Sequence, residues 1–187
     1  MQVITRFAPS PTGLLHIGGA RTALFNYLFA RHHHGRFLIR IEDTDKERST
    51  NKAVEAIFDG LKWLGLEGDE PAIFQSNNIN RHRKIANELI NSNLAYHCFL
   101  SKSEIEIIRN QNKKEGKPFR SPWRNPDHKG IKYEKPVLRL RMPEHGSTLI
   151  KDIVQGDVKV DNRQLDDLVL LRSDNTPTYM LAVVVDD

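Results

Sequence analysis

The sequence predicts an α/β protein with a Rossmann-type, doubly wound parallel sheet that carries an inserted α+β module. Two observations lead to this class. Within residues 3–41 a strand, a helix and a second strand follow one another, which implies a right-handed crossover between parallel strands. After Tyr96 this regular pattern gives way to a basic, proline-bearing stretch and short strand-like runs, which is typical of an insertion.

The first strand is expected over residues 3–8 and the turn that ends it over residues 9–13. Proline lacks the N–H that a sheet needs, and glycine permits a tight turn. From Ala20 apolar residues recur at three- and four-residue spacing, so we expect a helix that Gly35 ends. Residues 36–41 alternate apolar and charged side chains as the second strand, which runs into the acidic turn Glu-Asp-Thr-Asp.

Further elements follow the same patterns. Helices are predicted over residues 52–64 and 81–91, a short helix from Glu104, a strand at 137–141 and a hairpin around 155–157. The apolar runs 168–171 and 179–185 return to sheet-packing character, and the chain stops inside an element, so we expect a fragment. The predicted division is residues 1–95 for the first half of a nucleotide-binding domain, 96–170 for the insertion, and 171–187 for the start of the second half.

Composition excludes several classes of protein. Hydrophobic residues make up 39% and charged residues 28%, no stretch approaches the roughly 20 apolar residues of a membrane span, and no secretory signal precedes the first strand. We therefore expect a cytoplasmic, monomeric protein without a membrane segment. Cys98 is the only cysteine, which excludes an internal disulfide and a zinc site of several cysteines. His32, His33 and His34 point about 100° apart on a helix and cannot converge on one metal ion.

The positive charge is concentrated in one segment. The formal net charge is +4, but residues 109–135 hold nine lysines and arginines against three acids, so this segment carries about +6. Two interpretations stay open at this point. The segment is either a solvated loop or a surface for RNA, whose phosphates and unstacked bases suit cations with interleaved aromatic residues.

The turn before the first helix has the chemistry of a phosphate site. The start of a helix presents backbone N–H groups and the positive end of the helix dipole, and Gly18 and Gly19 let a nucleotide approach the backbone. His16 lies where an imidazole can donate to a phosphoryl oxygen as negative charge accumulates. The alternative is an ordinary helix start with an incidental histidine.

The wider run favours the functional interpretation. Residues 6–26, RFAPSPTGLLHIGGARTALFN, and residues 40–45, RIEDTD, closely resemble the first signature of bacterial glutamyl-tRNA synthetases, a class I aminoacyl-tRNA synthetase family. The resemblance continues less strictly through the whole chain, including residues 172–179 and 184–187. It implies the class I synthetase catalytic fold, incomplete in this chain, with a module that binds the tRNA acceptor end. The HIGH-type motif of the family stands here as HIGG, with glycine in the fourth position.

The resemblance also implies the site residues. The catalytic motif is His16, Gly18 and Gly19, and the ATP-binding set is Pro9, Ser10, Pro11, Thr12, Gly13, His16, Gly18 and Gly19. The glutamate-binding set is Arg6, Ala8, Ser10, Glu42 and Tyr179. The chemistry agrees, because a substrate with two carboxylates and an ammonium needs a cation such as Arg6 and an anion such as Glu42. The alternative for Glu42 and Asp45 is a solvated acidic turn.

The implied reaction joins L-glutamate to tRNA in two steps through glutamyl-adenylate, with ATP and Mg²⁺ as substrate. The family also uses a lysine-bearing KMSKS-type loop, which this sequence lacks, so the chain alone is expected to be inactive. Residues 100–103, LSKS, look similar only superficially, because Ser101 and Glu104 are typical of a capping box that starts a helix.

The insertion is expected to grip the acceptor end of tRNA(Glu). The residues predicted to contact tRNA are Asp45, Arg48, Lys113, Lys114, Lys117, Arg120 and Arg124. Many relatives place a zinc-binding cysteine cluster near Cys98, but Phe99, Leu100 and residues 121–124 offer no further thiolate, so no structural zinc is expected. The module must then be held by packing, for which Phe119, Trp123 and Tyr133 are candidates.

Two competing functions remain at the level of sequence. One is the related glutamyl-queuosine tRNA synthetase, which modifies an anticodon base, and the other is a non-catalytic nucleotide- or RNA-binding module. The presence of Arg6, His16 and Glu42 argues against the second. Whether a glutamine tRNA is also charged is not encoded in this stretch of chain.

Overall fold

The computed structural model describes residues 2–45, 48–132 and 135–187. These residues form two compact units. The first extends to Ile79 and includes Asp186, and the second runs from Asn80 to Val185 and includes Asp187. The division predicted from the sequence, with boundaries at 95 and 170, stays a prediction, although compactness places a boundary after Ile79.

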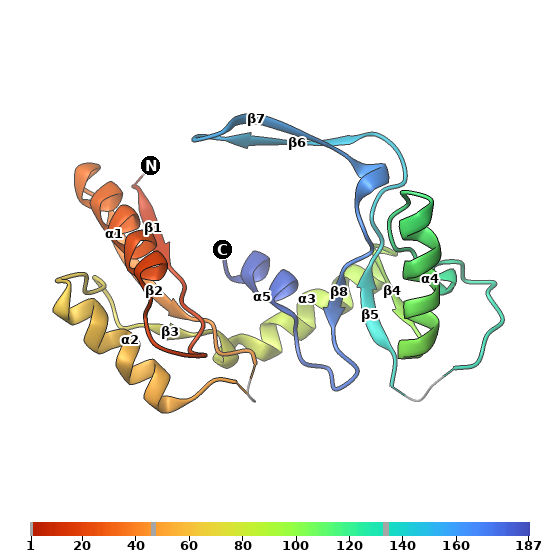
Figure 1. The fold of residues 1–187 in the computed structure, drawn as a ribbon, viewed down its shortest axis with the longest axis horizontal. Helices are drawn as coiled ribbons and strands as arrows, with labels where there is room; N and C mark the ends of the chain where they lie inside the picture. The colour runs from red at the N-terminus through yellow and green to blue at the C-terminus, as the bar shows by residue number, and fades with distance from the viewer. Residues whose placement is uncertain (1, 46–47, 133–134) are drawn as a thin grey trace. The chain divides into compact units, whose positions relative to one another are not determined.

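The first unit is a parallel sheet with crossover helices (Figure 1). Its elements are β1 (Ile4–Phe7), α1 (Ile17–His32), β2 (Arg36–Ile41), α2 (Asn51–Trp63), β3 (Ile73–Phe74) and the 3₁₀ turn η1 (Gln75–Asn78). The strand order is β1-β2-β3, with Arg6 beside Leu38 and Arg40 beside Ile73. The predicted strand, helix and parallel strand are therefore confirmed, as is the α/β class.

The core of this unit lies between the sheet and its helices. Phe37, Ile39 and Ile41 alternate along β2, so they share one face, and all three are buried. On that face they pack with buried residues of both helices, Ala23, Ala30, Ile57 and Leu61. Burying a large apolar side chain contributes about 1.5–3 kcal/mol, so this cluster is the main stabilising feature of the unit. Both crossovers cover the same face, and the opposite face carries Arg6, Leu38 and Arg40.

The end of α1 differs in detail from the prediction. The helix ends at His32, and the left-handed residue after it is His34, with φ of 52°, rather than Gly35. Gly35 is needed for another reason, because a Cβ at this position would collide with the carbonyl oxygen of Val3. Its N–H donates to Ala30 O over 2.7 Å. Glycine therefore brings the chain against β1 instead of providing the left-handed turn.

The second unit contains an antiparallel sheet in the order β4-β5-β8, a separate two-stranded ribbon and three helices. Its elements are α3 (Ile79–Asn91, whose first residue belongs to the first unit), β4 (Ala95–Cys98), α4 (Lys102–Lys114), η2 (Pro122–Arg124), β5 (Val137–Leu140), β6 (Ser147–Asp152), β7 (Gly156–Asp161), η3 (Asn162–Gln164), β8 (Val169–Leu171) and α5 (Tyr179–Asp186). The capping box of Ser101 and Glu104 at the start of α4 is confirmed.

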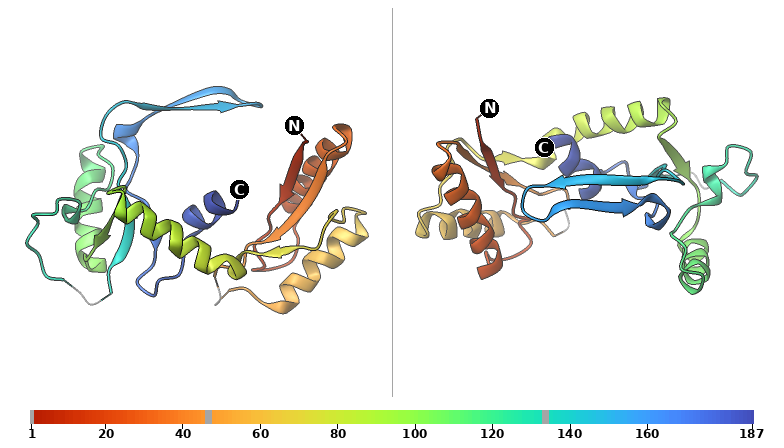
Figure 2. Two further views of the ribbon diagram at one scale, coloured as in Figure 1. Left: turned by 180° about the vertical axis from the view of Figure 1, so that it is seen from behind. Right: turned by 90° about the horizontal axis from the view of Figure 1, so that it is seen from above.

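The predicted hairpin is present as β6 and β7, which extend from the rest of this unit as a long ribbon (Figure 2). Gly156, with φ of 76°, begins β7 at the turn. The apolar run at 168–171 supplies β8, which pairs antiparallel with β5. An apolar run of this length identifies a buried strand but not the strand beside which it lies, since pairing depends on distant residues.

A buried polar network holds the second unit together. The carboxylate of Asp167, which is fully buried, accepts hydrogen bonds from Tyr96 Oη (2.7 Å), Arg124 Nη1 (2.6 Å) and the N–H of Met142 (3.0 Å). Burial, followed by the hydrogen bond to Asp167, raises the pKa of Tyr96. Arg139 stacks on Phe119 and donates to the carbonyl of Asp167 (2.8 Å). The network therefore joins β4, β5, η2 and the approach to β8.

Aromatic packing accompanies this network. Phe119 is buried, and Trp123 packs against Phe99 and His128 with ring centroids 4.8 Å apart in each case. These contacts agree with the packing role that was predicted for the aromatic residues of the module. Tyr133, the third candidate, lies outside the described residues.

Candidate functional site

The loop after β1 is fixed through the carbonyl groups of its prolines. The N–H of Glu42 donates to Pro9 O (2.9 Å), and the N–H of Thr50 donates to Pro11 O (3.3 Å). Proline cannot donate a hydrogen bond but keeps its carbonyl as an acceptor, so the loop is tied to the end of β2 and the start of α2. Pro11 is buried, whereas Ser10, Thr12 and Gly13 are exposed. The predicted ATP-binding loop is thus anchored at its prolines and open elsewhere.

His16 is the N-cap of α1. Its Nδ1 accepts hydrogen bonds from the N–H groups of Gly18 (3.1 Å) and Gly19 (3.3 Å), and the ring is exposed. The sequence predicted that these N–H groups would point at a phosphate, whereas here they bind the histidine. Because Nδ1 accepts, the proton of a neutral imidazole must lie on Nε2. His16 therefore presents a hydrogen-bond donor at the start of the helix.

The two glycines are explained by local packing. A Cβ on Gly18 would lie 3.0 Å from Cε1 of His16, and a Cβ on Gly19 would lie 2.9 Å from Cδ1 of Leu15. Gly18 thus makes room for the capping imidazole, and Gly19 allows Leu15 to pack beneath the helix start. These are close approaches of side chains to backbone, in addition to the nucleotide approach that was predicted.

Arg6 lies on β1 near its carboxyl end, and Glu42 directly follows the carboxyl end of β2. Arg6 is half-buried on the face opposite the helices, and Glu42 follows β2 two residues after Arg40. Arg40 Nη2 donates to Glu42 Oε1 over 3.1 Å, and the two side chains are 5% and 6% exposed. Glu42 is therefore not part of a solvated acidic turn. Sequence reasoning missed Arg40, although Arg-x-Glu in a strand places both side chains on one face.

The other acids of this turn have structural partners. Asp43 accepts hydrogen bonds from the N–H (2.7 Å) and Oγ (2.6 Å) of Ser76, which ties η1 to the end of β2. Asp45 accepts from Nε of Arg48 (2.7 Å), whose side chain is largely exposed. Asp45 and Arg48, predicted near the tRNA terminus, thus form an ion pair at the surface.

The three remaining glutamate-binding predictions fall in two units. Ala8 is half-buried in the loop after β1 and Ser10 is exposed in the same loop. Tyr179 is the first residue of α5 in the second unit and is 51% exposed. The first unit therefore brings Arg6, Ala8, Ser10 and Glu42 to one set of strand ends, and the role of Tyr179 stays a prediction.

The predicted tRNA-binding cations separate into two groups. Lys113 and Lys114 are exposed at the end of α4, and Lys117, also exposed, pairs with Glu115 at 2.6 Å. The side chains of Arg120 and Arg124 instead form hydrogen bonds within the unit. Arg120 donates to the carbonyls of Pro143 (3.4 Å) and Asn162 (3.3 Å), and Arg124 binds Asp167, Met142 O and Glu144. Lys113 and Lys114 are therefore exposed charges, whereas Lys117 is exposed but paired with Glu115.

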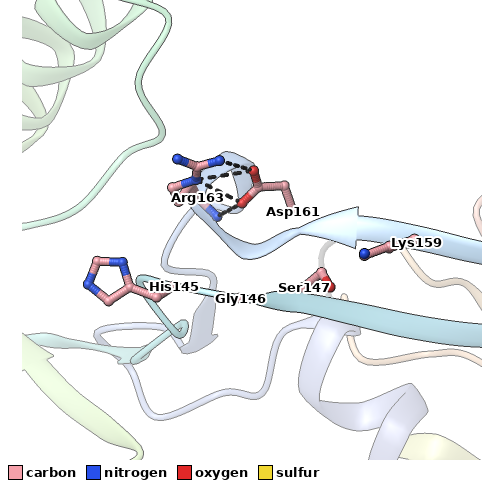
Figure 3. A pocket seen from close by; sticks show the side chains of 6 residues that line it. All are labelled: His145, Gly146, Ser147, Lys159, Asp161 and Arg163. Carbon is pink, nitrogen blue, oxygen red and sulfur yellow. Dashed lines mark hydrogen bonds and ion pairs between the residues drawn. The ribbon is translucent and has the colours of Figure 1, made fainter.

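A pocket of about 500 Å³ lies where the ribbon joins the rest of the second unit (Figure 3), lined by His145, Gly146, Ser147, Lys159, Asp161 and Arg163. The positively charged side chains of Lys159 and Arg163 in this lining would attract an anion. However, Arg163 binds both carboxylate oxygens of Asp161, at 2.7 to 3.2 Å, and lowers the pKa of that carboxyl to about 2. The pair is therefore internally neutral, which leaves Lys159 as the main source of positive charge in this pocket.

Cys98 is packed against a serine. Its thiol is buried and lies 3.3 Å from the Oγ of Ser121, a hydroxyl that is a poor zinc ligand. Across the described part of the chain, no three side chains of histidine, cysteine, aspartate or glutamate gather where they could hold a metal ion. Within residues 2–45, 48–132 and 135–187, no helix combines the length and apolar character needed to cross a membrane.

Comparison with known proteins identifies a family for this chain. The family model described as tRNA synthetases class I (E and Q), catalytic domain, matches residues 2–187. Among curated relatives, glutamate–tRNA ligase 1 of Rickettsia canadensis is 61% identical over 189 residues, and glutamate–tRNA ligase 2 of Paramagnetospirillum magneticum is 57% identical over 190. These matches cover 99% and 100% of this chain, but the chain spans only about 40% of the length of these relatives.

A solved structure has the same fold. A glutamate tRNA ligase from Elizabethkingia meningosepticum, crystallised in complex with its amino acid, superposes with a TM-score of 0.85 at 32% sequence identity. The match covers 100% of this chain and 42% of that one. The mixed α/β architecture with its parallel sheet is thus that of a class I synthetase catalytic domain.

Proposed function

Because this chain belongs to the class I tRNA synthetases (E and Q), catalytic domain family, we propose that it forms the ATP- and glutamate-binding part of an enzyme that ligates L-glutamate to tRNA. The observation that carries the proposal is the set of groups at the carboxyl ends of β1 and β2. His16 caps the helix that follows β1, Arg6 lies on β1, and Glu42 follows the neighbouring strand β2. Ligands of open parallel sheets bind at this edge.

Glutamate is recognised by charge at both ends. Arg6 supplies a guanidinium for one carboxylate, and Glu42 supplies the carboxylate that faces the ammonium group. Ala8 and Ser10 offer backbone groups in the loop after β1, and Tyr179 is proposed as a further glutamate-binding residue. The solved relative in complex with its amino acid supports glutamate as the ligand.

ATP is placed by the loop and the helix start. The exposed residues of the loop at 9–13 face solvent beside the start of α1, and His16 holds a proton on Nε2 that can be donated to a phosphoryl oxygen. Mg²⁺ accompanies the nucleotide as its counter-ion. In the first step the α-carboxylate oxygen of glutamate attacks the α-phosphorus, and the bond to pyrophosphate breaks. In the second a terminal hydroxyl of tRNA attacks the acyl carbon, loses its proton and releases AMP.

Calorimetry with this chain tests the site. ATP and a non-hydrolysable glutamyl-adenylate analogue are titrated separately into the unchanged chain and into Glu42→Gln. We expect both ligands to bind the unchanged chain, and we expect Glu42→Gln to bind the analogue about 10- to 100-fold more weakly, because a charge-assisted hydrogen bond is lost. ATP affinity should stay within about twofold. An unchanged chain that ignores both ligands would favour a pure RNA-binding module.

The exposed lysines of α4 and the following turn are proposed to bind the acceptor end of tRNA(Glu). Replacing Lys113, Lys114 and Lys117 by alanine should weaken tRNA binding and reduce the slope of log affinity against log salt by about 2, because roughly 0.7–0.9 of a counter-ion is released per phosphate contact. Lys52, Lys62 and Lys84, which are also exposed, form the matched triple control. An unchanged slope would contradict the contact.

The proposed reaction is a step of translation, and this bears on where and in what form the enzyme acts. We propose that the enzyme acts as a monomer in the cytoplasm. The second unit is proposed to need no structural zinc, because the Asp167 network supplies the internal connections. Dialysis against a chelator should therefore leave its unfolding midpoint unchanged.

A further inference from the structure

Arg40 and Glu42 form a buried ion pair on the strand face that also carries Arg6. Their side chains are 5% and 6% exposed, and the Nη2 to Oε1 distance is 3.1 Å. The two residues are separated by one position in an extended segment, so the backbone presents both side chains on the same face. Ile41 between them points into the core on the opposite face and is fully buried.

Other arginine–carboxylate pairs in this unit are placed differently. Arg36, also on β2, pairs with Glu70, and Arg31 on α1 pairs with Asp69, but each arginine side chain is 38% exposed. A buried ion pair rarely stabilises a protein more than apolar side chains of the same volume would, because both charges lose their hydration. Stability alone therefore does not explain a charged pair in such a place.

We propose that Arg40 is a positioning residue for the recognition of the substrate ammonium group. By donating to Oε1, its guanidinium fixes the orientation of the Glu42 carboxylate and keeps that carboxylate ionised while it is removed from water. Glu42 can then meet an ammonium group as a fixed anion, without first reorienting. The inference rests on the proposed function and adds a residue to it, since Arg40 need not touch glutamate itself.

A selective defect distinguishes this role from a general structural one. Glutarate has the two carboxylates of glutamate but no ammonium, so its binding does not need the Glu42 anion. Without the guanidinium, Glu42 would take up a proton or rotate away from its site. Loss of Arg40 should therefore weaken glutamate binding and leave glutarate binding nearly unchanged, whereas a disturbed fold would weaken both.

The experiment measures the ratio of glutamate to glutarate affinity by calorimetry in the unchanged chain, Arg40→Gln and the control Arg36→Gln. The control breaks an ion pair of the same strand at its other end. We expect the ratio to fall about 10-fold or more in Arg40→Gln, as for a lost charge-assisted hydrogen bond, and to stay within about twofold in Arg36→Gln.

The outcomes separate the two proposals. An unchanged chain that shows no preference for glutamate overturns the glutamate site and the inference together. A preference that survives in Arg40→Gln, or equal losses for both ligands, overturns the inference alone. Should Arg40→Gln fail to fold by circular dichroism, the ratio is measured in Arg40→Lys, which keeps the charge without the planar fork. A partial fall there supports the role, and a ratio equal to that of the unchanged chain overturns it.

Discussion

The parallel sheet of the first unit and the three-stranded antiparallel sheet of the second bury charged side chains in different settings. In the parallel sheet, Arg40 and Glu42 lie at the carboxyl end of β2, where loops open and ligands bind. In the second unit, Asp167 is fully enclosed by Tyr96, Arg124 and the backbone of Met142. The same contact between arginine and carboxylate is thus proposed to serve recognition in one place, and it joins elements of the interior in the other.

Removing the enclosed carboxylate should have the largest effect on stability. Asp167→Ala leaves the buried guanidinium of Arg124 and the hydroxyl of Tyr96 without their acceptor, so we expect the free energy of unfolding to fall by about 3–5 kcal/mol. Urea unfolding measures this change. Asp157→Ala, at an exposed position of the ribbon, is the control and should stay within about 0.5 kcal/mol. A loss below about 1 kcal/mol in Asp167→Ala would show that the network is not structural.

The pair at the parallel sheet should behave differently when both partners are removed. Arg40→Met alone strands a buried carboxylate and should cost about 3 kcal/mol of unfolding free energy, whereas Arg40→Met with Glu42→Leu should differ from the unchanged chain by about 1 kcal/mol at most. The double variant should nevertheless lose its preference for glutamate over glutarate. If it unfolds as readily as the single variant, the pair is architectural like Asp167.

His16 combines a structural and a chemical role that two variants can separate. His16→Ala removes the N-cap and should lower the free energy of unfolding by about 1 kcal/mol and weaken ATP binding. Asparagine is a good N-cap, so His16→Asn should keep most of the stability but still lose ATP affinity, because the donor at Nε2 is gone. Thermal unfolding and calorimetry with ATP follow the two effects. Equal ATP binding by His16→Asn and the unchanged chain would remove the phosphate contact.

The smallest effect concerns an exposed pair of the first unit. The bidentate hydrogen bonds from Arg31 lower the pKa of Asp69 from 3.8 to about 2, helped by the N–H of Phe37. A carboxyl whose pKa is depressed in the folded state stabilises the fold above pH 3.8, and this contribution disappears as the pH falls towards 2. Because the pair is partly exposed, solvent reduces it to about 1 kcal/mol or less.

Asp69→Asn is the variant for this test. Its unfolding free energy at neutral pH should be lower by that amount, and it should lose less stability than the unchanged chain between about pH 4 and pH 2. Urea titrations at several pH values compare the two chains. Parallel stability curves across this window would contradict the contribution of Asp69.

Local patterns predicted the elements and part of the site. The alternation at residues 36–41 predicted β2, and the proline- and glycine-rich run at residues 9–13 predicted the loop after β1. Ser101 and Glu104 predicted the start of α4. These features depend on neighbours within a few residues, so they can be read without a fold. The phosphate-binding interpretation of Gly18 and Gly19 was incomplete, because the nitrogen that accepts from them belongs to His16 in the same turn.

By itself the sequence determined the α/β class, the family resemblance and the residues at the first strand ends, because each depends on local periodicity or on a contiguous motif. Only the tertiary structure decided which charged side chains form ion pairs inside the protein. It assigned Arg124 to Asp167, 43 positions away, and separated it from the exposed Lys113 and Lys114. It also placed Arg40 on Glu42 at the edge that carries Arg6. The physical reason is that burial and pairing depend on residues distant along the chain, which composition and spacing do not encode.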